Sequence, residues 1–185
     1  MKTQQHIKLA QLTALISFLL GTGIFGFYFL TSSFELLCIV YNFIVLTGLV
    51  NLLILISILV KANNDKYNRK KVFTTCGVML LNIPVMLFYL WIAGILLNTM
   101  RITFTNPTQA TLTNINIVGC GGGHIDTLES GKSQTVWVEI TGDCSLNINY
   151  LSDGLPKEEN VAGYLTPLMG QKMTHNIGGQ NKKQF

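Results

Sequence analysis

The chain has 185 residues and a formal net charge of +4, with 13 Lys and Arg against 9 Asp and Glu, and 49% of its residues are hydrophobic. The positive charge is concentrated in short segments beside apolar runs, so it does not indicate a nucleic-acid partner. The composition also changes near residue 100, from apolar and almost free of acids to rich in Thr, Asn and Gly. We therefore expect two unlike parts.

Three long apolar runs fill the first part, and none of them contains Asp, Glu, Lys, Arg or His. They cover residues 9–30, 36–60 and 72–97. A helix rises about 1.5 Å per residue and the hydrocarbon core is about 30 Å thick, so about 20 apolar residues cross a bilayer. The runs predict three transmembrane helices. The first run is longer than the apolar core of a signal peptide and lacks a following Ala-x-Ala site, although a cleaved signal peptide is the alternative.

Basic residues occur before the first run and between the second and third runs, but not between the first and second. The N-terminal segment 1–8 carries Lys2 and Lys8, and the loop 61–71 carries five basic residues against one acid, whereas the loop 31–35 has no basic residue. Because Lys and Arg near the ends of spans stay in the cytoplasm, the N-terminus and the loop 61–71 are predicted to be cytoplasmic. The loop 31–35 and the C-terminal part are then outside. We expect a protein of the bacterial inner (plasma) membrane.

A few amide side chains interrupt the predicted spans. Asn51 and Asn82 fall at the same depth in antiparallel neighbours, with Ser17 nearby, and Asn42 lies nearer the outer face. Amides in hydrocarbon need partners, and an interhelical hydrogen bond contributes about 0.5–2 kcal/mol. We expect interhelical polar contacts, with a polar path for a substrate as the alternative. The sequence Asn82-Ile-Pro84 predicts a helix kink, since Pro removes a backbone donor.

From Arg101 the apolar positions alternate with a period of two, which is typical of half-buried strands. Strands are expected at residues 102–104, 112–118, 124–128, 134–141, 146–150, 161–167 and 171–177. Turn residues separate them at 106–107, 119–123, 130–131 and 153–156. Several short strands at close spacing predict a small antiparallel β-sandwich over 98–177, and 178–185 is expected to be a disordered tail.

One part of this region resembles the immunoglobulin-like sandwich domains of bacteria. A strand that ends at Asn106 is followed by Leu128-Glu-Ser-Gly131-Lys-Ser133, a Leu-x-x-Gly-x-Ser pattern that leads into the strand around Val136. The resemblance covers residues 101–152 and lacks the Trp and Cys spacing of antibody domains. It implies an Ig-like fold, and it brings no activity with it.

Cys120 and Cys144 fall at the same end of the expected sandwich, in a compartment that favours disulfides. We expect them to form a disulfide that stabilises a small core. One alternative is a metal site of Cys120, His124 and Cys144, with Asp126 or Asp143 as a further ligand. The other alternative is two free thiols. No residue pattern predicts a cofactor.

The side chain of Trp137 alternates with Val136 and Val138, so it is expected on the opposite face of its strand and marks a possible partner surface. The leading hypothesis is a non-enzymatic accessory or scaffold protein that presents its sandwich to a membrane or periplasmic partner, or to another copy, in an envelope complex. One alternative is an oligomeric transport or channel component that uses the Asn51 and Asn82 layer. Others are a sensory or immunity membrane protein, or an extracytoplasmic enzyme with a Cys120–His124 pair.

Overall fold

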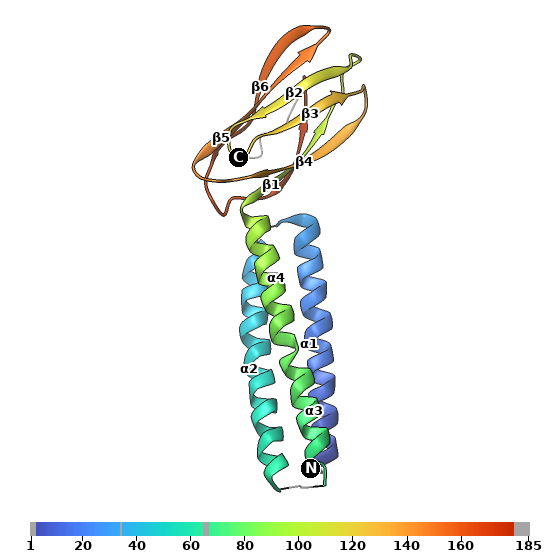
Figure 1. Ribbon diagram of the computed structural model, residues 1–185, viewed down its shortest axis with the longest axis vertical. Coiled ribbons are helices and arrows are strands. Elements are labelled where there is room, and N and C mark those ends of the chain that lie inside the picture. The colour runs from blue at the N-terminus through green and yellow to red at the C-terminus, as the bar shows by residue number, and fades with distance from the viewer. Residues whose placement is uncertain (1–2, 34, 65–66, 180–185) are drawn as a thin grey trace. The chain divides into compact units, whose positions relative to one another are not determined.

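The computed structural model describes residues 3–33, 35–64 and 67–179. The chain divides into two compact units, Met1–Ala93 and Gly94–Phe185. The first unit holds the long helices and the second the strands (Figure 1). Most of the tail expected at 178–185 lies outside the described residues, and so do Met1 and Lys2.

The first unit is helical. Its elements are α1 (Thr3–Thr31), α2 (Glu35–Asn64), α3 (Arg69–Leu80) and α4 (Asn82–Leu97), the last of which continues into the second unit. By length and composition, the described residues contain three helices that are apolar enough to cross a membrane: Gln4–Thr31, Glu35–Val60 and Arg69–Leu97. The prediction of three long apolar helices is therefore confirmed.

The third long helix is interrupted at Leu81, between α3 and α4. Pro84 has no backbone N–H, and its ring clashes with the carbonyl four residues earlier, which belongs to Leu80. The regular helix therefore ends one turn before the proline, and the N–H of Leu81 bonds to the carbonyl of Gly77 at 3.1 Å. This interruption is the local feature that the Asn82-Ile-Pro84 sequence predicts.

The second unit is built of seven strands in two sheets. The strands are β1 (Thr99–Thr105), β2 (Leu112–Val118), β3 (Gly123–Leu128), β4 (Ser133–Glu139), β5 (Cys144–Ser152), β6 (Leu155–Leu165) and β7 (Lys172–Asn176). One sheet has the order β4-β1-β7 and the other the order β3-β2-β5-β6 (Figure 1). The alternation of apolar residues thus located the strands, and the sheets do not close into a barrel.

Two details differ from the sequence prediction. The pair β1 and β7 is parallel, whereas an antiparallel arrangement was expected throughout. The segment before β7 returns to the point where β1 begins, and there the N–H of Gly170 bonds to the carbonyl of Leu97. From that point β7 runs beside β1 in the same direction. The turn after β5 is also shorter than predicted, since Ser152 already pairs with Leu155.

The core of the second unit draws on both sheets. Its fully buried side chains include Phe104 of β1, Ile115 of β2 and Ile148 of β5. Both cysteines of the second unit pack against the edge of this cluster. The outward positions of the strands carry mostly Thr, Ser, Asn and charged residues, as the alternation requires.

Candidate functional site

Asn51 and Ser17 lie together in the helical unit. The Asn51 amide donates hydrogen bonds to the Ser17 hydroxyl at 3.0 Å and to the carbonyl of Thr47 at 2.8 Å. The Asn51 Oδ1 atom is buried and has no hydrogen-bond partner in the described structure. This contact joins α2 to α1, as the depth argument from the sequence expects.

Asn82 also bonds to α1, but at a different place. Its amide donates to the carbonyl of Ala14 at 3.0 Å, one turn before Ser17. Asn42 is exposed, and its amide bonds to the carbonyl of Cys38 in its own helix at 2.8 Å. Asn51 and Asn82 therefore both make contacts of the kind that hold helices together. The alternative of a polar path for a substrate stays a prediction.

Replacing Asn82 by Leu should lower the stability of the helical unit by about 0.5–2 kcal/mol, because the hydrogen bond to the Ala14 carbonyl is lost. The matched control is Asn42→Leu, since Asn42 bonds only within its helix in the described structure and lies at the surface. Unfolding in a mixed-micelle denaturant titration measures both variants. Equal midpoints for the two variants would contradict an interhelical role for Asn82.

A cavity of about 410 Å³ lies between α1, α2 and α4. Tyr89 closes it on one side: its ring stacks on Phe25 at 4.4 Å between centroids, and its hydroxyl lies 2.8 Å from that of Thr22. Gly21 faces the ring of Phe43 on α2. The lining is mainly apolar, and Asn51 and Asn82 are among the few polar residues in it. This volume lies in the range of small-molecule sites.

Cys120 and Cys144 are joined in the second unit, with a distance of 1.93 Å between the sulfur atoms and 5.3 Å between the Cα atoms. Gly119 makes this approach possible, because a Cβ at that position would lie 1.8 Å from the carbonyl oxygen of Ser145 and its φ is +98°. The disulfide ties the turn after β2 to the start of β5. A metal site that used both cysteines would need free thiolates, which the disulfide does not provide.

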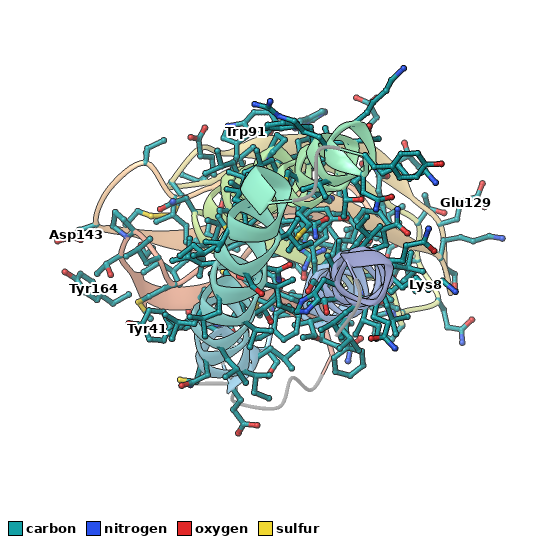
Figure 2. The ribbon with its side chains drawn as sticks, turned by 90° about the horizontal axis from the view of Figure 1, so that it is seen from below. Lys8, Tyr41, Trp91, Glu129, Asp143 and Tyr164 are labelled. Carbon is teal, nitrogen blue, oxygen red and sulfur yellow. A yellow bond between two sulfur atoms is a disulfide. The ribbon has the colours of Figure 1, made fainter. Side chains whose placement is uncertain are left out.

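His124 lies on the outward face of β3, where it is exposed. Its Nδ1 is 2.7 Å from Asn116 Oδ1, and its Nε2 is 3.0 Å from Asp126 Oδ1. In the described part of the chain, no three His, Cys, Asp or Glu side chains are grouped so that they could hold a metal ion. Asp143 is not part of the His124 contacts, and it accepts a hydrogen bond from the Tyr164 hydroxyl at 2.8 Å (Figure 2). This hydrogen bond raises the pKa of the Tyr164 phenol.

Trp137 points outward from β4, and half of its surface (50%) is exposed. The guanidinium of Arg101 on the neighbouring strand lies over its ring, 5.4 Å from the centroid. Farther along the same face, hydroxyl groups pair across the strands: Thr103 with Thr135 at 2.8 Å and Thr105 with Ser133 at 2.9 Å. Trp137 thus lies at one end of an uncharged hydroxyl surface made of these four residues. On its other side the same face carries the charged residues Arg101, Lys172 and Glu139.

A buried polar network was not predicted from the sequence. Glu159 of β6 accepts hydrogen bonds from the Tyr150 hydroxyl and, at 2.8 Å, from the N–H of Gly178. Its second oxygen lies 3.1 Å from Nε2 of His175, a side chain of β7 that is only 3% exposed and whose ring meets Phe104 edge-on. Burial, and then the hydrogen bond to Glu159, raise the pKa of Tyr150. Glu159 therefore links the edges of the two sheets.

The link that Glu159 makes between the two sheets could not be predicted from the sequence, because Glu159 stands in the charged run Lys157-Glu158-Glu159 beside a predicted turn. Such a run usually indicates a solvated surface. The pairing of β6 with β5 places Glu159 opposite the buried Ile148. On that side of the sheet its carboxylate comes within hydrogen-bond distance of His175 on β7.

Comparison with known proteins adds no relative. No protein-family model matches the chain, and no curated protein and no solved structure shows significant similarity to it.

Proposed function

We propose that this chain is an integral protein of a bacterial inner membrane. In this proposal α1, α2 and the interrupted helix α3–α4 cross the bilayer, the N-terminus lies in the cytoplasm, and the second unit is an Ig-like sandwich outside. Three long apolar helices and the basic flanks support the spans and their direction. The bonded pair Cys120–Cys144 supports an oxidising compartment for the second unit.

The biochemical role we propose is that of an accessory or scaffold protein, whose second unit binds a protein partner in the cell envelope. The observation that carries this proposal is the half-exposed Trp137 at the end of the uncharged hydroxyl surface of Thr103, Thr105, Ser133 and Thr135. Trp is enriched among residues that dominate binding, and the centres of interfaces are depleted of charge.

The outward face of the other sheet is chemically different. A row of paired residues crosses its four strands, His124, Asn116, Asn149 and Glu158, and Asp126 lies beside His124. Charged and amide side chains of this kind are well solvated and cost free energy when a partner removes their water. We therefore place the partner on the β4-β1-β7 face, over Trp137 and the uncharged hydroxyl surface, with Lys172 and Glu139 at the rim of the contact.

Labelling of single cysteines tests the orientation. In a chain with Cys38→Ala and Cys76→Ala, Leu155→Cys and Tyr67→Cys each add one exposed thiol, in the second unit and before α3 respectively. A membrane-impermeant maleimide should label Leu155→Cys in cells with a permeabilised outer membrane, and Tyr67→Cys only after lysis. The reverse pattern would invert the topology and remove the proposed compartment.

Site-specific photocrosslinking tests the partner surface. A photoreactive phenylalanine at Thr135 should give one adduct of discrete mass in cells, and the adduct should be lost in a Trp137→Ala chain because the binding contact is weakened. The same residue at Asn149, on the outward face of the other sheet, is the control and should give none. A chain that forms no adduct from Thr135 at native expression would contradict the scaffold role.

A further inference from the structure

The loop between β6 and β7, residues 166–171, is attached to the end of α4. The N–H of Gly170 donates to the carbonyl of Leu97 at 2.7 Å, and the N–H of Leu168 donates to Oδ1 of Asn98 at 3.2 Å. These bonds lie within the second unit, which includes the last turn of α4. The height of the loop along that helix is therefore fixed by two hydrogen bonds.

The same region completes the end of α4. The last four carbonyls of a helix lack hydrogen-bond partners within the helix. A carbonyl left without a partner is destabilising in or near a bilayer, because little water is there to bond to it. The Asn98 amide bonds to the carbonyl of Gly94 at 2.9 Å, and the Thr99 hydroxyl bonds to that of Ile95 at 2.8 Å. Gly170 supplies the partner of Leu97. The loop is thus part of the termination of this helix.

Gly170 is required for this approach. A Cβ at position 170 would lie 2.3 Å from the carbonyl oxygen of Leu96 and 2.6 Å from that of Leu97. These distances are well inside van der Waals contact, and both atoms belong to the backbone, which cannot move aside easily. Any larger residue would move the loop away from the end of the helix.

The loop exposes apolar side chains at this place. The side chain of Leu168 is 61% exposed, and Met169 next to it is also exposed. Leu168 has a φ of +72°, a left-handed conformation that Leu rarely adopts. Exposure of this leucine to water is unfavourable, whereas contact with lipid would bury its side chain.

The depth of the loop follows from the length of the helix. The apolar run 72–97 has 26 residues, so it extends about 39 Å at about 1.5 Å per residue. The hydrocarbon core is about 30 Å thick and the whole bilayer about 40–45 Å. At the average tilt of such helices, about 20°, the run spans about 37 Å along the bilayer normal. If the run starts at the cytoplasmic edge of the core, Leu97 lies about 7 Å beyond the outer edge of the core, in the outer headgroup region, and the attached loop lies at the same level.

We infer that Leu168 and Met169 insert into the headgroup region of the outer leaflet, where their side chains reach toward the acyl chains. The partner of this surface is the bilayer itself, and the second unit would then touch it at a defined point beside α4. The inference rests on the proposed membrane insertion.

Fluorescence quenching by spin-labelled lipids tests the contact. The chain with Cys38→Ala and Cys76→Ala receives one NBD-labelled cysteine in place of Leu168, Leu155 or Leu87, and is placed in phosphatidylcholine–phosphatidylglycerol nanodiscs. Leu155 is the matched control, since it is a similarly exposed leucine (65%) at the start of β6. Leu87 is an exposed residue within α4, about 15 Å below Leu97 along the helix.

NBD at position 168 should be quenched about threefold more than at 155 by a nitroxide near the headgroup, and less by one deep in the acyl chain. NBD at position 87 should be quenched most by the deep nitroxide. If 87 is quenched and 168 behaves like 155, the loop contact is wrong while the membrane insertion stands. If 87 is not quenched by either lipid, the proposed insertion fails and the loop contact fails with it.

The substitution Gly170→Ala tests whether the bond to α4 sets the depth. It should bring the quenching at 168 down to the level at 155 and leave that at 87 unchanged. Gly142→Ala is its control, because nothing lies within 4 Å of an added Cβ there. Unchanged quenching at 168 in the Gly170→Ala chain would overturn the role of the helix end. Should that variant not fold, the comparison of 168 with 155 still decides the lipid contact.

Discussion

Breaking the Cys120–Cys144 disulfide should lower the free energy of unfolding of the second unit by about 3.5 kcal/mol. The two cysteines are separated by 24 residues, and the chain-entropy model assigns this value to a loop of that size at 25 °C. For a unit of this length the melting temperature should fall by about 15–25 °C. The measurement is thermal unfolding of the full chain in detergent with Cys120→Ser and Cys144→Ser, followed by the fluorescence of Trp137 in a Trp91→Phe background.

The control for this experiment is the chain with Cys38→Ala and Cys76→Ala, which keeps the disulfide. Its melting temperature should fall on addition of dithiothreitol by the same amount as in the Cys120 and Cys144 variant. A reductant that leaves the melting temperature of this control unchanged would mean that the disulfide is not formed in the protein or does not stabilise it.

Replacing Glu159 by Ala should lower the free energy of unfolding of the second unit by about 3 kcal/mol. The Tyr150 hydroxyl, His175 Nε2 and the Gly178 N–H would then lose the side chain to which all three bond, in a mostly buried place. Glu158 is the matched control: it is the preceding residue, it is exposed on the outward face, and its replacement by Ala should change stability by less than about 0.5 kcal/mol. Thermal unfolding of the full chain measures both. Equal losses would show that Glu159 does not link the sheets.

Alkaline titration gives a second measurement of the same network. Burial and Glu159 raise the pKa of Tyr150 above the ordinary value of about 10, so its proton stabilises the fold fully at neutral pH. That contribution is lost as the pH rises above about 10, where tyrosines of the unfolded chain ionise. In Glu159→Ala the pKa should fall toward its ordinary value. An unchanged phenolate absorbance curve would contradict this coupling.

The helices and the strands could largely be predicted from the sequence, because both depend on local periodicity. Uncharged runs of more than 20 residues leave few alternatives to a long helix, and Pro84 marks the interruption near Leu81. The alternation around Ile102 and Phe104 likewise located β1. The parallel pairing of β7 with β1 could not be predicted, since it depends on the path of the segment before β7 and local alternation does not specify strand direction.

Among the site residues, some contacts could be predicted from position in the sequence, and others depend on how the elements pack. The contact of Asn51 with Ser17 follows from depth alone, because antiparallel helices bring equal depths together. Asn82 was expected at the same level, and it bonds instead to a backbone carbonyl of α1, at Ala14. The network around Glu159 depends on how one edge of each sheet meets the other, and no local pattern carries that information.

The direct passage from α4 to β1 has a mechanical consequence. Only Asn98 stands between Leu97 and Thr99, and the carbonyls of this last turn are held by Asn98, Thr99 and Gly170. Since β1 is the central strand of its sheet, no compliant segment separates the final turn of the helix from the middle of that sheet. Within the second unit, a force on the face that carries Trp137 therefore reaches the last turn of α4 through the backbone of β1 and the hydrogen bonds of Asn98, Thr99 and Gly170.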